Sequence, residues 1–337
     1  MVRVRVPCSS LTIDSHRARL YRLIFSLAAA YNVGLGLWAV LAPNSFFDLF
    51  QMARPRYPSI WSTLGLVLGL YGLLYLYAAI HLDRARPIIA VGLAGKILGP
   101  IGWILTVHGG GLPIRTFPLI AFDDIVWWLP FGLFLLEGSA FGRRLRALAP
   151  LACAIVNFIA AGALLLVLRS GVTASDPGAG AAYVGQNGLI WRLGWGTWIG
   201  AALTLVAFYA WWGSRIERWR LAIGAFVIAT VGIACDITAE SLFIGWLPKD
   251  FESISRVATV LTGGAANGLY TVAGVMLTIA TPTLRGRLLA WTWAVWAAGF
   301  LLSAFSLLGI IPGIAASTGA LFILFCPWCV AIWRKLR

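Results

Sequence analysis

The chain has 337 residues, of which 60% are hydrophobic and only 11% charged, and its formal net charge is +14. Soluble proteins have roughly a quarter of their residues charged, so this composition excludes a soluble globular protein. The basic residues form short clusters between apolar stretches instead of one patch. This pattern argues against a nucleic-acid-binding surface and is typical of a protein that crosses a lipid bilayer many times.

Apolar stretches long enough to cross a hydrocarbon core of about 30 Å recur along the whole chain. Charge clusters, prolines and glycines separate them. We therefore predict an all-α integral membrane protein with about ten transmembrane helices. The predicted spans are residues 20–42, 62–81, 87–108, 117–136, 148–169, 190–212, 220–243, 257–280, 288–308 and 311–333. Segment 170–189, between the fifth and sixth spans, reads as a flexible polar external loop.

Basic residues are concentrated in alternate connections of this arrangement. The positive-inside rule then predicts that both termini are cytoplasmic. The first 20 residues are basic and have no apolar core or cleavage site, so we expect no removable signal peptide and assign the insertion signal to the first span.

The sequence also indicates an internal repeat. Ile60–Trp61 and Ile190–Trp191 each precede a span, a short basic loop, a second span and a "GGLP" or "GWLP" stretch. We expect a tandem 4+4 pseudo-repeat in parallel orientation, followed by two helices. The predicted parts are a cytoplasmic segment 1–19, four-helix units 20–146 and 147–287, and a C-terminal helix pair with a basic tail, 288–337.

Three charged residues of the first half lie deep within predicted spans, where a charge costs about 2.5–3.5 kcal/mol on insertion scales. Lys96 is near the middle of the third span, and Asp123 and Asp124 are in the outer part of the fourth. A short connection joins the two spans, so they must be antiparallel neighbours. We expect at least one aspartate to pair with Lys96 and the other to find a different partner. A structural ion pair and a ligand, proton or substrate site remain alternatives.

The second half offers further intramembrane polar residues as secondary candidates. Asp236 and Glu240 are one helical turn apart, with Asp236 expected in the outer leaflet and Glu240 near the interface. Asn267 lies in a glycine-rich stretch that favours close helix contact. Asn32 and Asn157 occupy similar depths in the first helices of the two units. Intramembrane asparagines more often bridge helices than bind ligands.

The motif "CPWC", Cys326 to Cys329, has the spacing of a redox or metal site. It lies at the cytoplasmic end of the last span, with no strand context and no second Cys/His pair to complete a zinc set. We expect these thiols to stay reduced. No metal site and no cofactor are predicted.

Four stretches of the first half are distinctive together: "AAYNVGLGLWAVLAP", "RPRYPSIW", "GKILGPIGW" and "DDIVWWLPFG". On these stretches, residues 20–146 resemble a set of small bacterial four-helix membrane proteins, often labelled alkyl hydroperoxide reductase. That label implies a peroxidatic cysteine in a thioredoxin-like domain, whereas residues 1–146 contain only Cys8. The activity is therefore not carried over. The resemblance implies a multi-pass protein of the bacterial cytoplasmic (inner) membrane and places Lys96, Asp123 and Asp124 in recognisable segments of that set.

Three functions fit these features. The leading hypothesis is a protein that binds or permeates a small lipophilic ligand or a proton-coupled solute at Lys96, with Asp123 or Asp124 as counter-ion and proton carrier. The second is a non-catalytic membrane subunit that docks a membrane protein partner through Trp and Gly surfaces. The third is an intramembrane lipid-modifying enzyme with Asp236, Glu240 or the aspartate pair as acid and base. The expected partners are the lipid bilayer and a small ligand or protein, with no nucleic acid.

Overall fold

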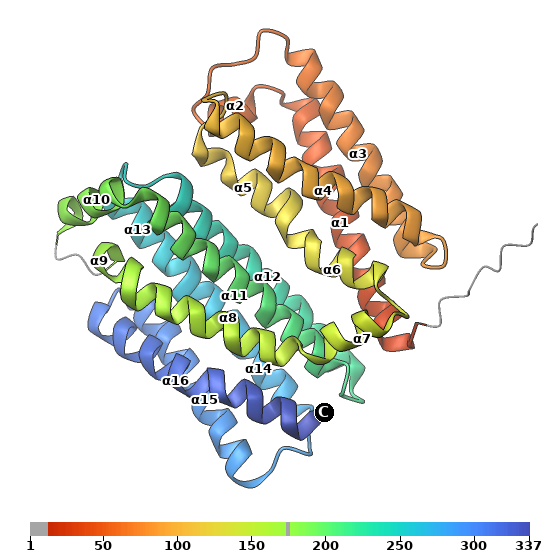
Figure 1. Ribbon diagram of the computed structural model, residues 1–337, viewed down its shortest axis with the longest axis vertical. Helices are drawn as coiled ribbons and strands as arrows, with labels where there is room; N and C mark the ends of the chain where they lie inside the picture. The colour runs from red at the N-terminus through yellow and green to blue at the C-terminus, as the bar shows by residue number, and fades with distance from the viewer. Residues whose placement is uncertain (1–12, 173–175) are drawn as a thin grey trace, which may run out of the picture. The chain divides into compact units, whose positions relative to one another are not determined.

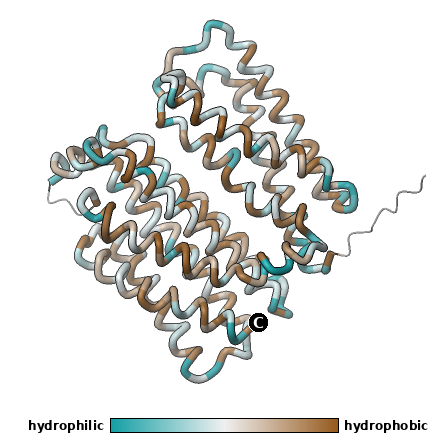
Figure 2. The backbone as a smooth tube through the Cα atoms, in the orientation of Figure 1, coloured by the Kyte–Doolittle hydropathy of each residue, from teal (hydrophilic) through white to brown (hydrophobic). Residues whose placement is uncertain are grey.

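The computed structural model describes residues 13–172 and 176–337 (Figure 1). Cys8 and most of the basic N-terminal segment lie outside these ranges. Within them the chain forms helices and connections and contains no β-strand. Figure 2 shows apolar residues along the helices and polar residues mainly at the connections.

The prediction of ten membrane-spanning helices is confirmed for the described residues, because ten helices there are long and apolar enough to cross a bilayer. The chain is a multi-pass integral membrane protein. The ten helices are α1 (Ser15–Leu41), α3 (Pro58–Ile80), α4 (Ala85–His108), Ile114–Leu135, Ala149–Val172, α11 (Gly188–Gly213), α12 (Trp219–Gly245), Phe251–Ile279, α15 (Gly286–Leu308) and α16 (Ile311–Leu336).

Three of these spans are composite, because a π-helical segment interrupts each. Their parts are η1 (Ile114–Thr116), α5 (Phe117–Ile120), η2 (Ala121–Ile125) and α6 (Val126–Leu135); α8 (Ala149–Ala163), η3 (Leu164–Leu168) and α9 (Arg169–Val172); α13 (Phe251–Thr259), η4 (Val260–Ala266) and α14 (Asn267–Ile279). The π segments are η2, η3 and η4, and η1 is a 3₁₀ turn. Single π turns inside α-helices occur frequently at functional sites.

Short helices occupy three of the connections: α2 (Ser45–Leu49), α7 (Ala140–Ala147) and α10 (Pro177–Gln186). The prediction of a flexible loop over 170–189 is therefore wrong for the α10 residues. The side chain of Asp176 accepts hydrogen bonds from the backbone N–H groups of Gly178 (2.8 Å) and Ala179 (3.0 Å), and Pro177 is the first helical residue. An N-cap aspartate followed by proline is a strong helix start.

The chain divides into two compact units. The N-terminal unit comprises the described residues up to Ile101 together with Asp123–Arg144, and the C-terminal unit comprises Gly102–Phe122 and the described residues of Leu145–Arg337. One division falls in α4 directly after Pro100 and Ile101, and another falls within the π segment η2.

In the N-terminal unit, α1 and α3 pack with their backbones in contact. A Cβ atom on Gly36 would lie 2.5 Å from the carbonyl oxygen of Gly65 and 2.7 Å from the backbone nitrogen of Gly69. Small residues allow such close approach between membrane helices, where packing replaces the hydrophobic effect as the driving force. Aromatic rings fill the adjoining core, with Phe25 and Phe134 edge to face at a centroid distance of 4.9 Å.

A buried carboxylate, Glu137, ties three segments of this unit together. It accepts hydrogen bonds from the Arg17 guanidinium and, at 3.0 Å, from the Tyr21 hydroxyl. Its backbone carbonyl accepts a hydrogen bond from Arg86 at 2.7 Å. The sequence alone did not single out Glu137, because its partners are more than fifty residues away along the chain.

We expect Glu137→Ala to reduce the stability of the N-terminal unit by about 1–3 kcal/mol, because both donors would lose a buried, charged acceptor. Thermal unfolding of the purified protein in detergent measures this loss. The control is Asp83→Ala, which removes a largely exposed carboxylate 3.7 Å from Arg84. Exposed ion pairs contribute about 0–1 kcal/mol, so equal melting temperatures for the two variants would contradict the role of Glu137.

In the C-terminal unit, six helices form a closed ring. Consecutive contacts run from α8 to α11, α12, α14, α15 and α16, and α16 packs back against α8. The last two helices of the chain therefore complete the ring that the preceding four begin. Figure 1 shows α8, α11 and α12 running side by side and α15 next to α16.

Buried tryptophans stabilise this ring by donating hydrogen bonds to threonine side chains. The indole N–H groups of Trp212, Trp296 and Trp328 each donate to a threonine hydroxyl at 2.9 Å, those of Thr281, Thr278 and Thr292 respectively. The N–H of a buried Trp usually finds a hydrogen-bond partner, and these bonds fix the orientation of the three rings. Trp328 belongs to the "CPWC" motif, whose Cys326 and Cys329 are also buried among helices.

Candidate functional site

Lys96 of α4 is buried, with its side chain 5% exposed, and its charge is satisfied within the N-terminal unit. Its Nζ lies 3.3 Å from Oδ1 of Asp123 and donates a hydrogen bond to the backbone carbonyl of the same residue. The ammonium also lies 6.0 Å from the centroid of the Tyr75 ring. The structure thus brings together the lysine and one of the two aspartates that the sequence pattern singled out.

The π segment η2 positions this ion pair. It contains both aspartates, and the wider turn disrupts the regular i→i−4 ladder, so a carbonyl there is available to an outside donor. Lys96 uses the carbonyl of Asp123 in this way. In the opposite direction, the indole N–H of Trp128 donates to the carbonyl of Lys96 at 2.8 Å. The two helices are therefore linked through both side chains and backbone.

Asp124 has a different environment from Asp123. Its carboxyl is buried and lies directly against α4, where a Cβ atom on Gly99 would be 2.5 Å from Oδ2. The glycine makes room for the second acid beside the ion pair. One lysine therefore lies close to two carboxyl groups, of which only Asp123 forms a salt bridge to it among the described residues.

A second group of polar residues centres on Asp236 of α12, which is 6% exposed. One oxygen accepts a hydrogen bond from the Thr262 hydroxyl, and the other accepts one from the Tyr270 hydroxyl at 3.2 Å. Thr262 lies in the π segment η4, and Tyr270 follows in α14. Gly232, one turn before Asp236, makes room for the Tyr270 ring, since a Cβ atom there would be 2.8 Å from a ring carbon.

Glu240, one turn after Asp236, is completely buried, and neither of its carboxyl oxygens has a hydrogen-bond partner among the described residues. From the sequence, Glu240 is a secondary candidate that we expect near the membrane interface. The structure encloses it in protein because α13, α5 and η1 pack against α12. An isolated carboxylate is expensive to bury, so Glu240 needs a physical explanation.

The three asparagines differ in what they bind. Asn267 donates to the carbonyl of Gly299 on α15 at 2.6 Å and so bridges two helices, as expected. Asn32 and Asn157 instead donate to the carbonyls of Ala28 and Cys153, four residues earlier in their own helices, each at 2.9 Å. The expectation of helix bridging is wrong for the side-chain N–H groups of these two, since a local carbonyl is within reach.

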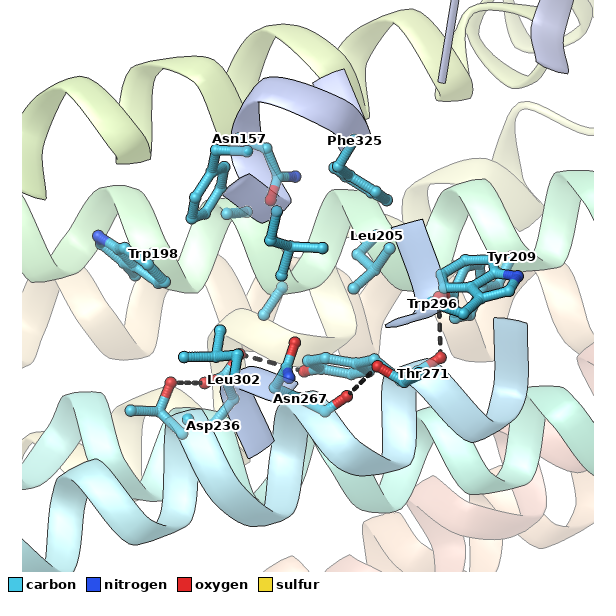
Figure 3. Close-up of a pocket in the computed structure, with 17 residues that line it drawn as sticks. Asn157, Trp198, Leu205, Tyr209, Asp236, Asn267, Thr271, Trp296, Leu302 and Phe325 are labelled. Carbon is cyan, nitrogen blue, oxygen red and sulfur yellow. Dashed lines mark hydrogen bonds between the residues drawn. The ribbon is translucent and has the colours of Figure 1, made fainter. Parts of the chain in front are cut away.

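A cavity of about 100 Å³ lies inside the six-helix ring (Figure 3). Its polar lining comes from five residues on four elements: Asn157, Asp236, Thr262, Asn267 and Thr271. Its aromatic lining consists of Trp198, Tyr209, Tyr270, Trp296, Phe322 and Phe325. Aliphatic residues and Gly263 complete it, and the described lining residues include no Lys, Arg or His.

The structure therefore gathers six of the eight predicted site residues into two places. Lys96, Asp123 and Asp124 meet in the N-terminal unit, and Asp236, Asn267 and Asn157 line one cavity in the C-terminal unit. Sequence reasoning missed Tyr270 and Thr271. Their positions three and four residues after Asn267 put them on the same helix face, which is the signal that could have identified them.

The ten apolar helices define the class of this chain as a multi-pass membrane protein. It contains two buried polar clusters, one around Lys96 and one around Asp236. Comparisons with protein-family models, with curated proteins and with solved structures found no match to the chain. What the two clusters do must therefore be inferred from their own chemistry.

Proposed function

We propose that this chain is a bacterial cytoplasmic-membrane protein that binds or permeates a small ligand, and that the ligand occupies the cavity inside the six-helix ring. The observation that carries the proposal is the cavity itself, with a carboxyl group, two amides and two threonine hydroxyls on an otherwise apolar and aromatic wall. Small-molecule sites combine apolar walls with a few converging polar groups in this way.

The size and lining of the cavity support this use over a packing defect. A cavity needs roughly 10–15 Å³ of space open to the centre of a water molecule to hold one water. The space of about 100 Å³ in this cavity is several times larger. An ionisable residue inside a membrane bundle, such as Asp236, is costly and is by default a candidate functional residue.

We expect Ala202→Phe to abolish ligand binding, because Ala202 is a buried lining residue and a phenyl ring would occupy the cavity. The measurement is native mass spectrometry of detergent-purified wild type and variant, with organic extraction of the copurifying molecules. The control is Ala234→Phe, which adds the same ring to the exposed face of α12.

The wild type and Ala234→Phe should retain the same copurifying molecule and Ala202→Phe should lose it. Retention by all three proteins would place the ligand elsewhere. If no protein retains a small molecule and thermal shifts with lipophilic probes are absent, the alternative of an accessory membrane subunit would be favoured.

The Lys96 cluster is a second candidate site, favoured by one observation: Asp124 is a second carboxyl group beside an already formed ion pair. In this proposal Lys96 is the cation, Asp123 its counter-ion and Asp124 the group that carries a proton. The alternative is a purely structural ion pair between two helices. The Lys96→Met variant described in the Discussion distinguishes a ligand or proton site from a structural ion pair.

We also propose that both termini are cytoplasmic and that the two four-helix units are a tandem repeat, with residues 20–146 related to small bacterial membrane proteins. Two structural features support the repeat. Asn32 and Asn157 make the same intrahelical hydrogen bond in the first helix of the predicted repeats 20–146 and 147–287. A π segment interrupts the fourth helix of each predicted repeat, η2 in the first and η4 in the second.

A further inference from the structure

We infer that the ligand of the cavity is a small organic cation, such as an amine or quaternary ammonium compound, whose positive charge lies beside Asp236. This inference rests on the proposed ligand site and names the chemical class that the site selects. It follows from the charge balance of the cavity, from its aromatic wall and from the way Asp236 is held.

The charge balance of the cavity is one-sided. Asp236 lines it and Glu240 lies one turn further along α12, and the described residues provide no ion pair to either. In the N-terminal unit, by contrast, Lys96 forms a salt bridge with Asp123. Buried charges are normally paired or coordinate a counter-ion, so Asp236 leaves a place in the cavity for a positive charge that the described residues do not fill.

The wall of the cavity suits an organic cation. Figure 3 shows Asp236, Asn267 and Thr271 on one side of the space and Asn157 on the opposite side, with Trp198 towards one end and Trp296 and Tyr209 towards the other. Aromatic rings attract cations through their negative faces, and quaternary ammonium recognition commonly uses several such rings. Six of the lining residues are aromatic.

Asp236 is fixed in place and still has capacity for another donor. Thr262 and Tyr270 each donate one hydrogen bond to it, one to each oxygen. A carboxylate can accept about four, so an ammonium N–H can be added without breaking either bond. A quaternary ammonium, which has no N–H, would use the same oxygens by charge alone.

The same features select against other ligand classes. An anionic ligand would meet Asp236 with no basic residue among the described lining residues to offset the repulsion. A neutral apolar ligand would displace water from the carboxyl group and both amides without replacing their hydrogen bonds, which costs binding free energy. Unpaired groups facing the wrong ligand are a common source of specificity.

The test compares a cation with a neutral molecule of the same shape. The probes are choline and 3,3-dimethylbutan-1-ol, in which carbon replaces the charged nitrogen, with tetramethylammonium as a smaller cation. Binding to the full chain in detergent or nanodiscs is measured by calorimetry and by the rise in melting temperature, since a ligand that binds only the folded state stabilises it.

We expect at least one cation to bind at least tenfold more tightly than the neutral probe. Asp236→Asn should weaken that cation at least tenfold and leave the neutral probe unchanged, whereas Glu252→Gln, which neutralises an exposed acid on α13, should change neither. The comparison of the two probe classes on wild type needs no variant, so poor folding of Asp236→Asn would not prevent the test.

Equal or tighter binding of the neutral probe, absence of cation binding, or an unchanged cation affinity in Asp236→Asn would overturn the inference. Ala202→Phe separates this failure from failure of the proposed function. If the neutral probe binds and Ala202→Phe blocks it, the cavity is a ligand site for a different class of molecule. If Ala202→Phe affects no ligand at all, both proposals fail.

Discussion

Gly36→Leu is expected to destabilise the N-terminal unit strongly, because the new side chain would have to displace the backbone of α3. A Cβ atom alone would lie 2.5 Å from the Gly65 carbonyl oxygen and 2.7 Å from the Gly69 nitrogen. Both obstacles are backbone atoms, which cannot rotate away as a side chain would. Overpacking typically costs about 1–3 kcal/mol and occasionally more.

The matched control is Gly34→Leu in the same helix, where a Cβ atom would meet nothing within 4 Å. Replacing glycine by a good helix former gains up to about 1 kcal/mol of helix propensity, so the control should be neutral or slightly stabilising. Thermal unfolding of both variants in the same detergent measures the difference. Similar melting temperatures for Gly34→Leu and Gly36→Leu would show that α1 and α3 do not pack as described.

Lys96→Met is the second substitution with a large expected effect. It removes the only cation in salt-bridge contact with Asp123 among the described residues and leaves a carboxylate without its partner inside the protein. Breaking a buried ion pair from one side typically costs about 3–5 kcal/mol. The double variant Lys96→Met with Asp123→Asn should recover part of this loss, since it no longer leaves an unpaired charge.

Unfolding of the two single variants and the double variant forms a double-mutant cycle that isolates the pair. Arg84→Met serves as the control because that side chain is 71% exposed and lies at the start of the same helical region. Additive effects in the cycle would contradict a direct Lys96–Asp123 interaction.

The same variant distinguishes the two roles of the Lys96 cluster. If Lys96→Met melts like wild type but loses a copurifying molecule, the cluster is a binding site. If it melts at a lower temperature and the copurifying molecules are unchanged, the charges are structural, and the cavity of the C-terminal unit is the site to pursue.

The ten spans could be predicted from the sequence because a bilayer imposes a minimum length and a continuous apolar character on each helix. The proximity of Lys96 to an aspartate was predictable for a related reason. The short connection between the third and fourth spans allows only an antiparallel neighbour, and both depths can be counted from the ends of the helices. These inferences need no knowledge of how distant helices pack.

The cavity could not be predicted in this way, because its residues come from six helices whose order in the ring depends on tertiary packing. Glu240 illustrates the limit. Its position along α12 was known, but its burial depends on α13, α5 and η1, which cover that end of the helix. Asn32 and Asn157 show the opposite limit, since a local backbone carbonyl accepts a hydrogen bond from a side-chain N–H group that was expected to reach another helix.

The π segment η2 has a consequence for how residue spacing in the fourth span can be read. An α-helix turns about 100° per residue, and one extra residue in a turn rotates everything after it by that amount relative to an unbroken helix. The division between the two units falls within this segment, so α5 and α6 belong to different units. Two sequences with nearly the same hydropathy profile would therefore place different side chains against Lys96 if one of them lacked a single residue between Ala121 and Ile125.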